Sequence, residues 1–95
     1  QLTADAELAE LSRTRTLRPL LAVPESKRHV MAETLAAWLD HQGDRGAVAR
    51  ELVIHPQTVS YRMHRLRELF GDTLYAPDGR FALQAALRSG CRIPV

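Results

Sequence analysis

Apolar residues recur along most of the chain at the spacing of an amphipathic helix, and no stretch alternates between apolar and polar residues as a half-buried strand does. The clearest stripe predicts a helix over residues 26–42, with Ser26 as its N-cap and Gly43 at its end. The inward positions of this helix are Met31, Leu35, Trp38 and Leu39. The periodicity therefore predicts an all-α protein.

Two shorter helices are predicted before this one. The first covers about residues 4–13. The second is a short helix with Thr16 as its N-cap and Pro19 in its first turn, where the missing N–H of proline does no harm, and Pro24 ends it. Their inward residues are Leu8 and Leu11 in the first and Leu17, Leu20 and Leu21 in the second.

Three more helices are predicted after Gly43. Their ranges and end signals are 45–52 capped by Asp44, 56–70 with Pro56 at its first position and Gly71 at its end, and 79–89 capped by Asp78. The expected inward residues are Val48, Ala49 and Leu52 in the first and Phe81, Leu83, Ala86 and Leu87 in the last. The predicted fold is thus a small helical bundle of about five to six helices.

The two helices within residues 45–70 have the layout of a helix-turn-helix, because only Val53-Ile54-His55 separates them. Ala49 is small where the two helices must approach closely. Val53 occupies the place in the turn where glycine is usual, and His55 is expected to cap the second helix or pack against it. The sequence therefore predicts a helix-turn-helix unit whose second helix is available to a partner.

A helical wheel at about 100° per residue divides the second helix of this unit into two faces. The residues within about 40° of Val59, which should face inward, are Met63, Leu66 and Phe70. The opposite face carries Gln57, Tyr61, His64, Arg65 and Glu68, with Thr58 and Ser60 at its flanks. Hydrogen-bonding side chains therefore crowd the outward face near the start of the helix.

The net charge of +2, from 13 basic and 11 acidic residues, conceals a local concentration of positive charge. Residues 45–67 hold five Arg against Glu51 alone, a net of +4. Of the 13 basic side chains in the chain, 12 are Arg, whose planar fork suits phosphate groups and guanine edges. The segment with the helix-turn-helix therefore also has the charge of a nucleic-acid-binding surface.

We expect the outward face of the second helix to contact double-stranded DNA in the major groove. Gln57, Tyr61 and Arg65 are expected to touch bases or the adjoining backbone, since an amide can pair with adenine and a guanidinium with guanine. Arg45 and Thr58 are expected to anchor phosphates, together with free N–H groups at the starts of both helices. The predicted DNA-binding residues are Arg45, Gln57, Thr58, Ser60, Tyr61, His64 and Arg65.

Arg62 is expected to have a different role. It lies about 60° from the inward stripe on the wheel, too far inward to reach a groove easily. The sequence therefore predicts that Arg62 forms a structural ion pair with a nearby carboxylate.

Several other classes of function are not favoured. A chain of 95 residues buries only about 60 to 65% of its unfolded surface, which makes a large catalytic cleft hard to build, and no nucleophile elbow is present, so we do not expect an enzyme. Cys91 is the only cysteine and no two histidines lie three to five residues apart, so neither a metal site nor a cofactor is predicted. No apolar run approaches the roughly 20 residues of a membrane span, and we expect a cytoplasmic protein.

Two other kinds of partner compete with duplex DNA. The same helices could form a protein-interaction or dimerisation module, in which Tyr61 and Arg65 would be interface hot spots. RNA is less favoured, because the basic helix has no exposed aromatic set for base stacking beyond Tyr61. For a DNA-binding protein we also expect a homodimer, since one recognition helix contacts too few base pairs to select a single operator.

The run from His55 to Met63, His-Pro-Gln-Thr-Val-Ser-Tyr-Arg-Met, resembles the hallmark of the PucR-type C-terminal helix-turn-helix family, which includes regulators of purine catabolism and of sugar-diacid use. Further matching pieces are Thr16-Leu17-Arg18-Pro19-Leu20, Glu33-Thr34-Leu35 before Trp38-Leu39, Val48-Ala49-Arg50-Glu51-Leu52, and Gly71-Asp72 followed by Asp78-Gly79-Arg80. The similarity spans roughly residues 16–88. Two positions depart from the motif: Gln57 stands where the family commonly has Asn, and Pro56 where Arg is frequent.

The resemblance implies that Thr58, Tyr61 and Arg62 carry the DNA-binding role of the motif, although the wheel assigns Arg62 chiefly to structure. It also implies that the chain is the C-terminal output domain of a larger bacterial transcriptional regulator, whose upstream sensor domain is missing here. We accordingly expect a linker or dimerisation helix over residues 1–15, a helix-turn-helix DNA-binding domain over residues 16–89, and a C-terminal tail over residues 90–95.

Overall fold

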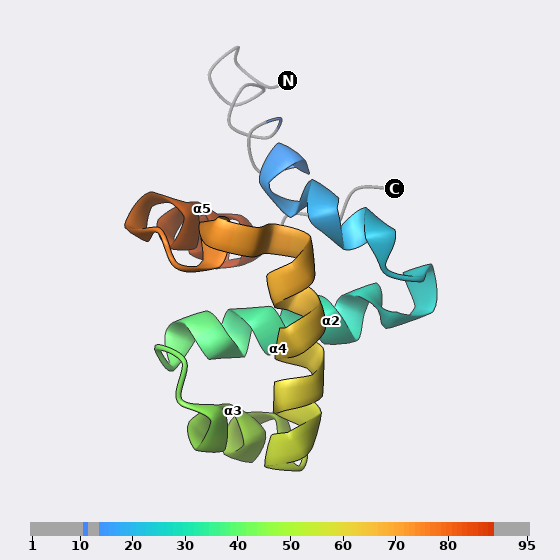
Figure 1. Ribbon diagram of the computed structural model, residues 1–95, viewed down its shortest axis with the longest axis vertical. Coiled ribbons are helices and arrows are strands. Elements are labelled where there is room, and N and C mark those ends of the chain that lie inside the picture. Colours follow the sequence, from blue (N-terminus) through green and yellow to red (C-terminus); the bar gives the residue numbers. More distant parts are fainter. Residues whose placement is uncertain (1–10, 12–13, 89–95) are drawn as a thin grey trace.

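The computed structural model describes residue 11 and residues 14–88 (Figure 1). In chain order the elements are the 3-10 helix η1 (Arg18–Ala22), the α-helices α2 (Glu25–Asp40), α3 (Arg45–Leu52) and α4 (Pro56–Phe70), the 3-10 helix η2 (Gly71–Leu74) and α5 (Pro77–Arg88). This part of the chain contains no strand. The predicted all-α class, a small bundle containing a helix-turn-helix, is confirmed.

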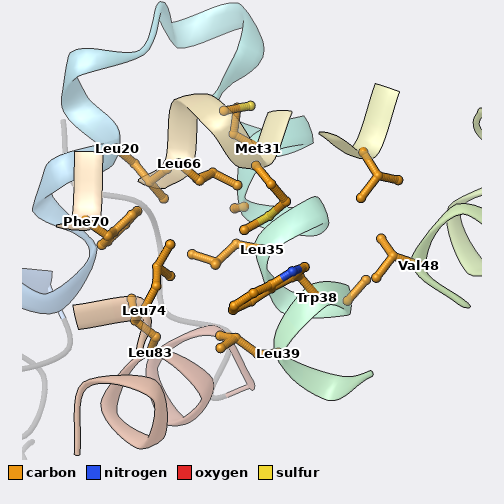
Figure 2. Close-up of a cluster of buried hydrophobic side chains, with 14 of the residues drawn as sticks. Leu20, Met31, Leu35, Trp38, Leu39, Val48, Leu66, Phe70, Leu74 and Leu83 are labelled. Carbon is orange, nitrogen blue, oxygen red and sulfur yellow. The ribbon is translucent and has the colours of Figure 1, made fainter. Parts of the chain in front are cut away.

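Helix α2 is the central element and packs against η1, α3, α4 and α5. The side chains between these elements form one hydrophobic cluster, shown in part in Figure 2, to which all six elements contribute. Leu35 of α2 and Leu66 of α4 are both fully buried in it. The predicted inward stripe of residues 26–42 is confirmed, since Met31, Leu35, Trp38 and Leu39 are all buried.

The two ends of α2 are set by different local features. The predicted N-cap Ser26 is wrong: the helix begins at Glu25 and Pro24 is its N-cap, without a side-chain cap hydrogen bond. At the other end Gln42 and Gly43 both have positive φ, of 52° and 83°. The Gly43 N–H donates to the Trp38 carbonyl and the Gln42 N–H to the Leu39 carbonyl, as in a Schellman motif. This reversal turns the chain towards α3.

The start of the described chain departs from the predicted short helix. Residues 14–17 are already helical and lead directly into η1, so Thr16 is not an N-cap. Pro19 lies in the first turn of η1, as predicted, and Leu17 and Leu20 are buried. The helix predicted over residues 4–13 lies almost wholly outside the described residues.

The last helix begins two residues earlier than predicted, at Pro77, and Asp78 lies in its first turn and not at its N-cap. Leu83 and Ala86 are fully buried as expected, but the inward position predicted for Phe81 is wrong, since this side chain is 74% exposed. Residues two apart on a helix point about 200° apart, so Phe81 and Leu83 cannot both face the core. The 3-10 helix η2 was not predicted.

Gly79 lies where α5 crosses the end of η2. A Cβ atom at this position would meet the Thr73 carbonyl oxygen and would lie 2.7 Å from the Thr73 Cγ2 atom. Only glycine allows the two backbones to approach this closely. The first turn of α5 is therefore held against η2 by backbone contact.

Candidate functional site

The helix-turn-helix consists of α3, the turn Val53-Ile54-His55 and α4. Asp44 caps α3 as predicted, since its Oδ1 accepts a hydrogen bond from the Ala47 N–H at 3.1 Å. Val53 has left-handed backbone angles, φ 56° and ψ 52°, and is 88% exposed. A left-handed conformation of this kind costs a β-branched residue about 1 to 2 kcal/mol. The turn therefore keeps the geometry that usually calls for glycine, at the cost of backbone strain.

The start of α4 is fixed by His55. The His55 Nδ1 accepts a hydrogen bond from the Gln57 N–H at 3.0 Å, and Pro56 occupies the first helical turn. Of the two roles expected for His55, capping the helix or packing against it, the structure shows the cap. The cap and Pro56 set the first turn of α4, and with it the direction in which Gln57 leaves the helix.

The two faces of α4 lie as the wheel predicts. The inward quartet Val59, Met63, Leu66 and Phe70 is buried. The side chains of Gln57, Tyr61, His64, Arg65 and Glu68 are exposed, and Thr58 and Ser60 are half-buried at the flanks. Tyr61 has 79% of its surface exposed. The structure thus places six of the seven predicted site residues on the exposed face of one helix or at its flanks.

Arg45, the seventh predicted site residue, reaches the same surface from the first turn of α3. Its Nη1 donates a hydrogen bond to the Ser60 Oγ at 2.9 Å. The contact joins residues 15 apart in the chain and places a guanidinium at one flank of the exposed face of α4. We call this exposed face, together with Arg45, the outer surface of the helix-turn-helix.

The N–H groups at the helix starts are less available than the sequence suggests. At α4 the Gln57 N–H is taken by the His55 side chain, and the Thr58 and Val59 N–H groups donate to the His55 carbonyl. At α3 the Asp44 carboxylate occupies the N-terminal position, where it disfavours another anion. Any anion bound at this surface must therefore be held mainly by side chains.

Arg62 points away from the outer surface, towards α2. Its Nη1 donates to the Thr34 Oγ1 at 3.1 Å, and Thr34 is fully buried and itself donates to the Val30 carbonyl at 2.8 Å. The acceptor is therefore a hydroxyl where we expected a carboxylate. The predicted ion pair is wrong, since over residues 14–88 no carboxylate pairs with Arg62. The side chain does point inward, as predicted, and joins α4 to α2.

Both acidic side chains within residues 45–70 have basic partners. The Glu51 Oε1 lies 2.7 Å from the His41 Nε2, and the Glu68 Oε1 lies 3.7 Å from the Arg65 Nη1. Arg50 and Arg67 are exposed on the same two helices. Both carboxylates of this segment are therefore paired, and Arg50 and Arg67 remain exposed to solvent.

Nothing in the described part of the chain suggests a metal centre or a membrane anchor. Residues 14–88 contain no group of three or more His, Cys, Asp or Glu side chains that could hold a metal ion. None of the helices in this range has the length and apolar character needed to cross a membrane. Cys91 lies outside the described residues.

Two residues of α2 that lie beside α4 were not predicted from the sequence as part of the site. Thr34, the acceptor for Arg62, lies on α2 within an otherwise apolar stripe. Lys27, also on α2, lines two hollows beside α4 together with Tyr61. Neither position follows from local sequence, because both depend on where α2 crosses α4. Lys27 also lies within residues 1–44, whose net charge is −2, so the charge pattern did not point to it.

Comparisons with known proteins agree with this geometry. The family model of the PucR C-terminal helix-turn-helix domain matches residues 31–89. An uncharacterised protein of Mycobacterium tuberculosis is 34% identical over 94% of the chain, which spans about a fifth (20%) of that relative's length. The carbohydrate diacid regulator of Escherichia coli is 39% identical over 62% of the chain and 15% of its own length. The purine catabolism regulatory protein of Bacillus subtilis is 31% identical over 72% of the chain and 13% of its own length. No solved structure gives a significant match.

Proposed function

The chain belongs to the PucR C-terminal helix-turn-helix family, and we propose that it binds double-stranded DNA by placing α4 in the major groove. The observation that carries this proposal is the outer surface itself. A row of exposed hydrogen-bonding side chains on α4 is held by a buried apolar stripe on its other face. The major groove admits an α-helix and displays a donor and acceptor pattern that such side chains can read.

The roles of the side chains follow from their chemistry. Gln57 would pair with adenine through its amide, and Arg65 with guanine O6 and N7. Tyr61 and His64 lie between them and would contact bases or the adjoining backbone. The remaining proposed contacts, to backbone phosphates, are made by Arg45, Thr58 and Ser60 at the flanks.

We propose further that the domain acts as the output part of a longer regulator. The mycobacterial relative is about five times as long as the chain. The regions matched in the two named relatives make up only 15% and 13% of their lengths. In this proposal residues 16–89 form the DNA-binding domain, residues 1–15 a linker or dimerisation helix, and residues 90–95 a tail. The regulator would act in the cytoplasm as a homodimer that reads two half-sites, by binding and not by catalysis.

A salt titration tests duplex binding directly. The logarithm of the affinity of the 95-residue chain for a duplex should fall linearly with the logarithm of salt concentration, by about 0.9 for each phosphate neutralised. Fluorescence anisotropy of a labelled duplex measures this slope. If no affinity is detected at low salt, DNA binding is wrong, and a protein-interaction role for Tyr61 and Arg65 becomes the better explanation of the exposed face.

Two substitutions should separate base reading from phosphate binding. Gln57→Ala should relax the preference at one base-pair position, at a cost of about 1 to 3 kcal/mol for the preferred sequence. Arg45→Ala should weaken binding to all duplexes alike and reduce the salt slope by about 1. Selection from random duplexes, followed by titration of single-position variants, measures both effects. If Gln57→Ala weakens all sequences equally, this side chain does not read a base.

A further inference from the structure

The exposed face of α4 is bordered by α2 as well as by α3. Lys27, in the first turn of α2, lines one hollow with Thr58 and Tyr61. It also lines a second hollow, of about 250 Å³, with Tyr61 and Arg65. In Figure 1 the first half of α2 emerges on one side of α4 while α3 lies on the other. The outer surface therefore continues from α4 onto α2.

Lys27 and Arg45 occupy opposite flanks of this surface. Thr58 and Ser60 are two residues apart, so they leave α4 about 200° apart, on either side of the exposed face between them. Arg45 is hydrogen-bonded to Ser60 on one flank, and Lys27 shares a hollow with Thr58 on the other. Two cations from two different helices thus border the exposed side chains of α4.

The charges around Lys27 leave its ammonium group available. Lys27 is exposed, and over residues 14–88 no carboxylate forms an ion pair with it. Glu68 lines one of the two hollows, but its carboxylate is paired with Arg65. An exposed lysine between hydrogen-bonding side chains matches the chemistry of a phosphate group, to which an ammonium binds as a point charge.

A helix in the major groove lies between two phosphate backbones, one at each edge of a groove about 12 Å wide. Arg45 and Thr58 were the phosphate anchors expected from sequence, and both lie within the helix-turn-helix. We propose that Lys27 binds a phosphate of the backbone opposite to the one held by Arg45, so that α2 and α3 contact the two edges of the same groove. This role rests on the proposed function, because it requires α4 to lie in the groove.

Lys27→Ala, compared with Arg88→Ala, tests this role. Lys27→Ala should weaken binding to all duplexes by about three- to tenfold and reduce the salt slope by about 0.9, while Lys27→Arg should keep both near the wild-type values. Arg88→Ala removes the same charge from α5, where Arg88 is paired with Asp40, and should leave the slope unchanged. Because Lys27 is exposed, the melting temperature of the Lys27→Ala variant should match that of the wild type.

Three results would count against this role, and they can be told apart. If the wild type binds duplexes with a steep salt slope and Lys27→Ala keeps that slope, Lys27 contacts no phosphate and the proposed function is unaffected. If Lys27→Ala instead alters preference at one base pair, the side chain reads a base and the phosphate contact is wrong. If the wild type binds no duplex, both the role of Lys27 and DNA binding fail.

Discussion

Leu66→Ala is expected to lower the free energy of unfolding by about 3 kcal/mol. Truncation of a buried leucine to alanine usually costs about 2 to 5 kcal/mol. Leu66 is fully buried and sits in the cluster that all six elements share. The truncation removes apolar contacts and leaves a cavity between α4 and α2. Since a domain of this size is stable by only about 5 to 15 kcal/mol, the loss is large. Urea denaturation followed by circular dichroism measures it.

Phe81→Ala is the matched control for this measurement. It truncates a larger apolar side chain on a helix, but Phe81 is exposed, so the change should stay within about 0.5 kcal/mol. Equal losses for the two variants would show that Leu66 is not held in the core. In that case the inward direction of the whole stripe on α4 would be wrong, and the outer surface with it.

Gly79→Ala is expected to destabilise the protein by about 1 to 3 kcal/mol, the usual cost of forcing an extra group into a packed contact. The added methyl group would meet the backbone and side chain of Thr73, so α5 must move away from η2. The movement would also disturb Leu83, which is fully buried on the same helix. Thermal and urea unfolding measure the effect.

Gly46→Ala is the matched control, and the opposite sign is expected for it. Gly46 lies in α3, and the nearest atoms to an added Cβ are the Arg50 Nη1 at 3.4 Å and the Asp44 Oδ1 at 3.5 Å. Alanine is better than glycine within a helix by about 0.5 to 1 kcal/mol, so this variant should gain stability. A loss of stability in Gly46→Ala, or none in Gly79→Ala, would contradict this account of the two glycines.

The inward and outward faces of α4 could be predicted from sequence because they depend on one helix alone. The apolar spacing of Val59, Met63 and Leu66 leaves a single way to bury the stripe, and the outward direction of Gln57 and Tyr61 follows geometrically. For the same reason Asp44 and His55 could be predicted as caps. Each is followed directly by its helix, with a side-chain acceptor within reach of the second or third N–H.

The predictions that failed depend on contacts between elements. Thr16 and Ser26 have the chemistry of N-caps, but Thr16 lies in a helical turn that leads into η1, and Ser26 is the second residue of α2. Phe81 is apolar, yet the close contact of Gly79 with Thr73 sets the rotation of α5 and turns Phe81 outward. The positions of Lys27 and Thr34 beside α4 likewise depend on the crossing of two helices, which no local pattern reveals.

The hydrophobic core that the six elements share limits how the domain can change its conformation. Melting or rotating α4 alone would break the packing of its apolar stripe, which belongs to the same cluster as Leu35 and Leu83. We therefore expect any signal that reaches this domain to move it as a whole, because a change of its internal shape would disrupt the shared core. In such a movement the six elements would keep their packing, and only the position and orientation of the domain would change.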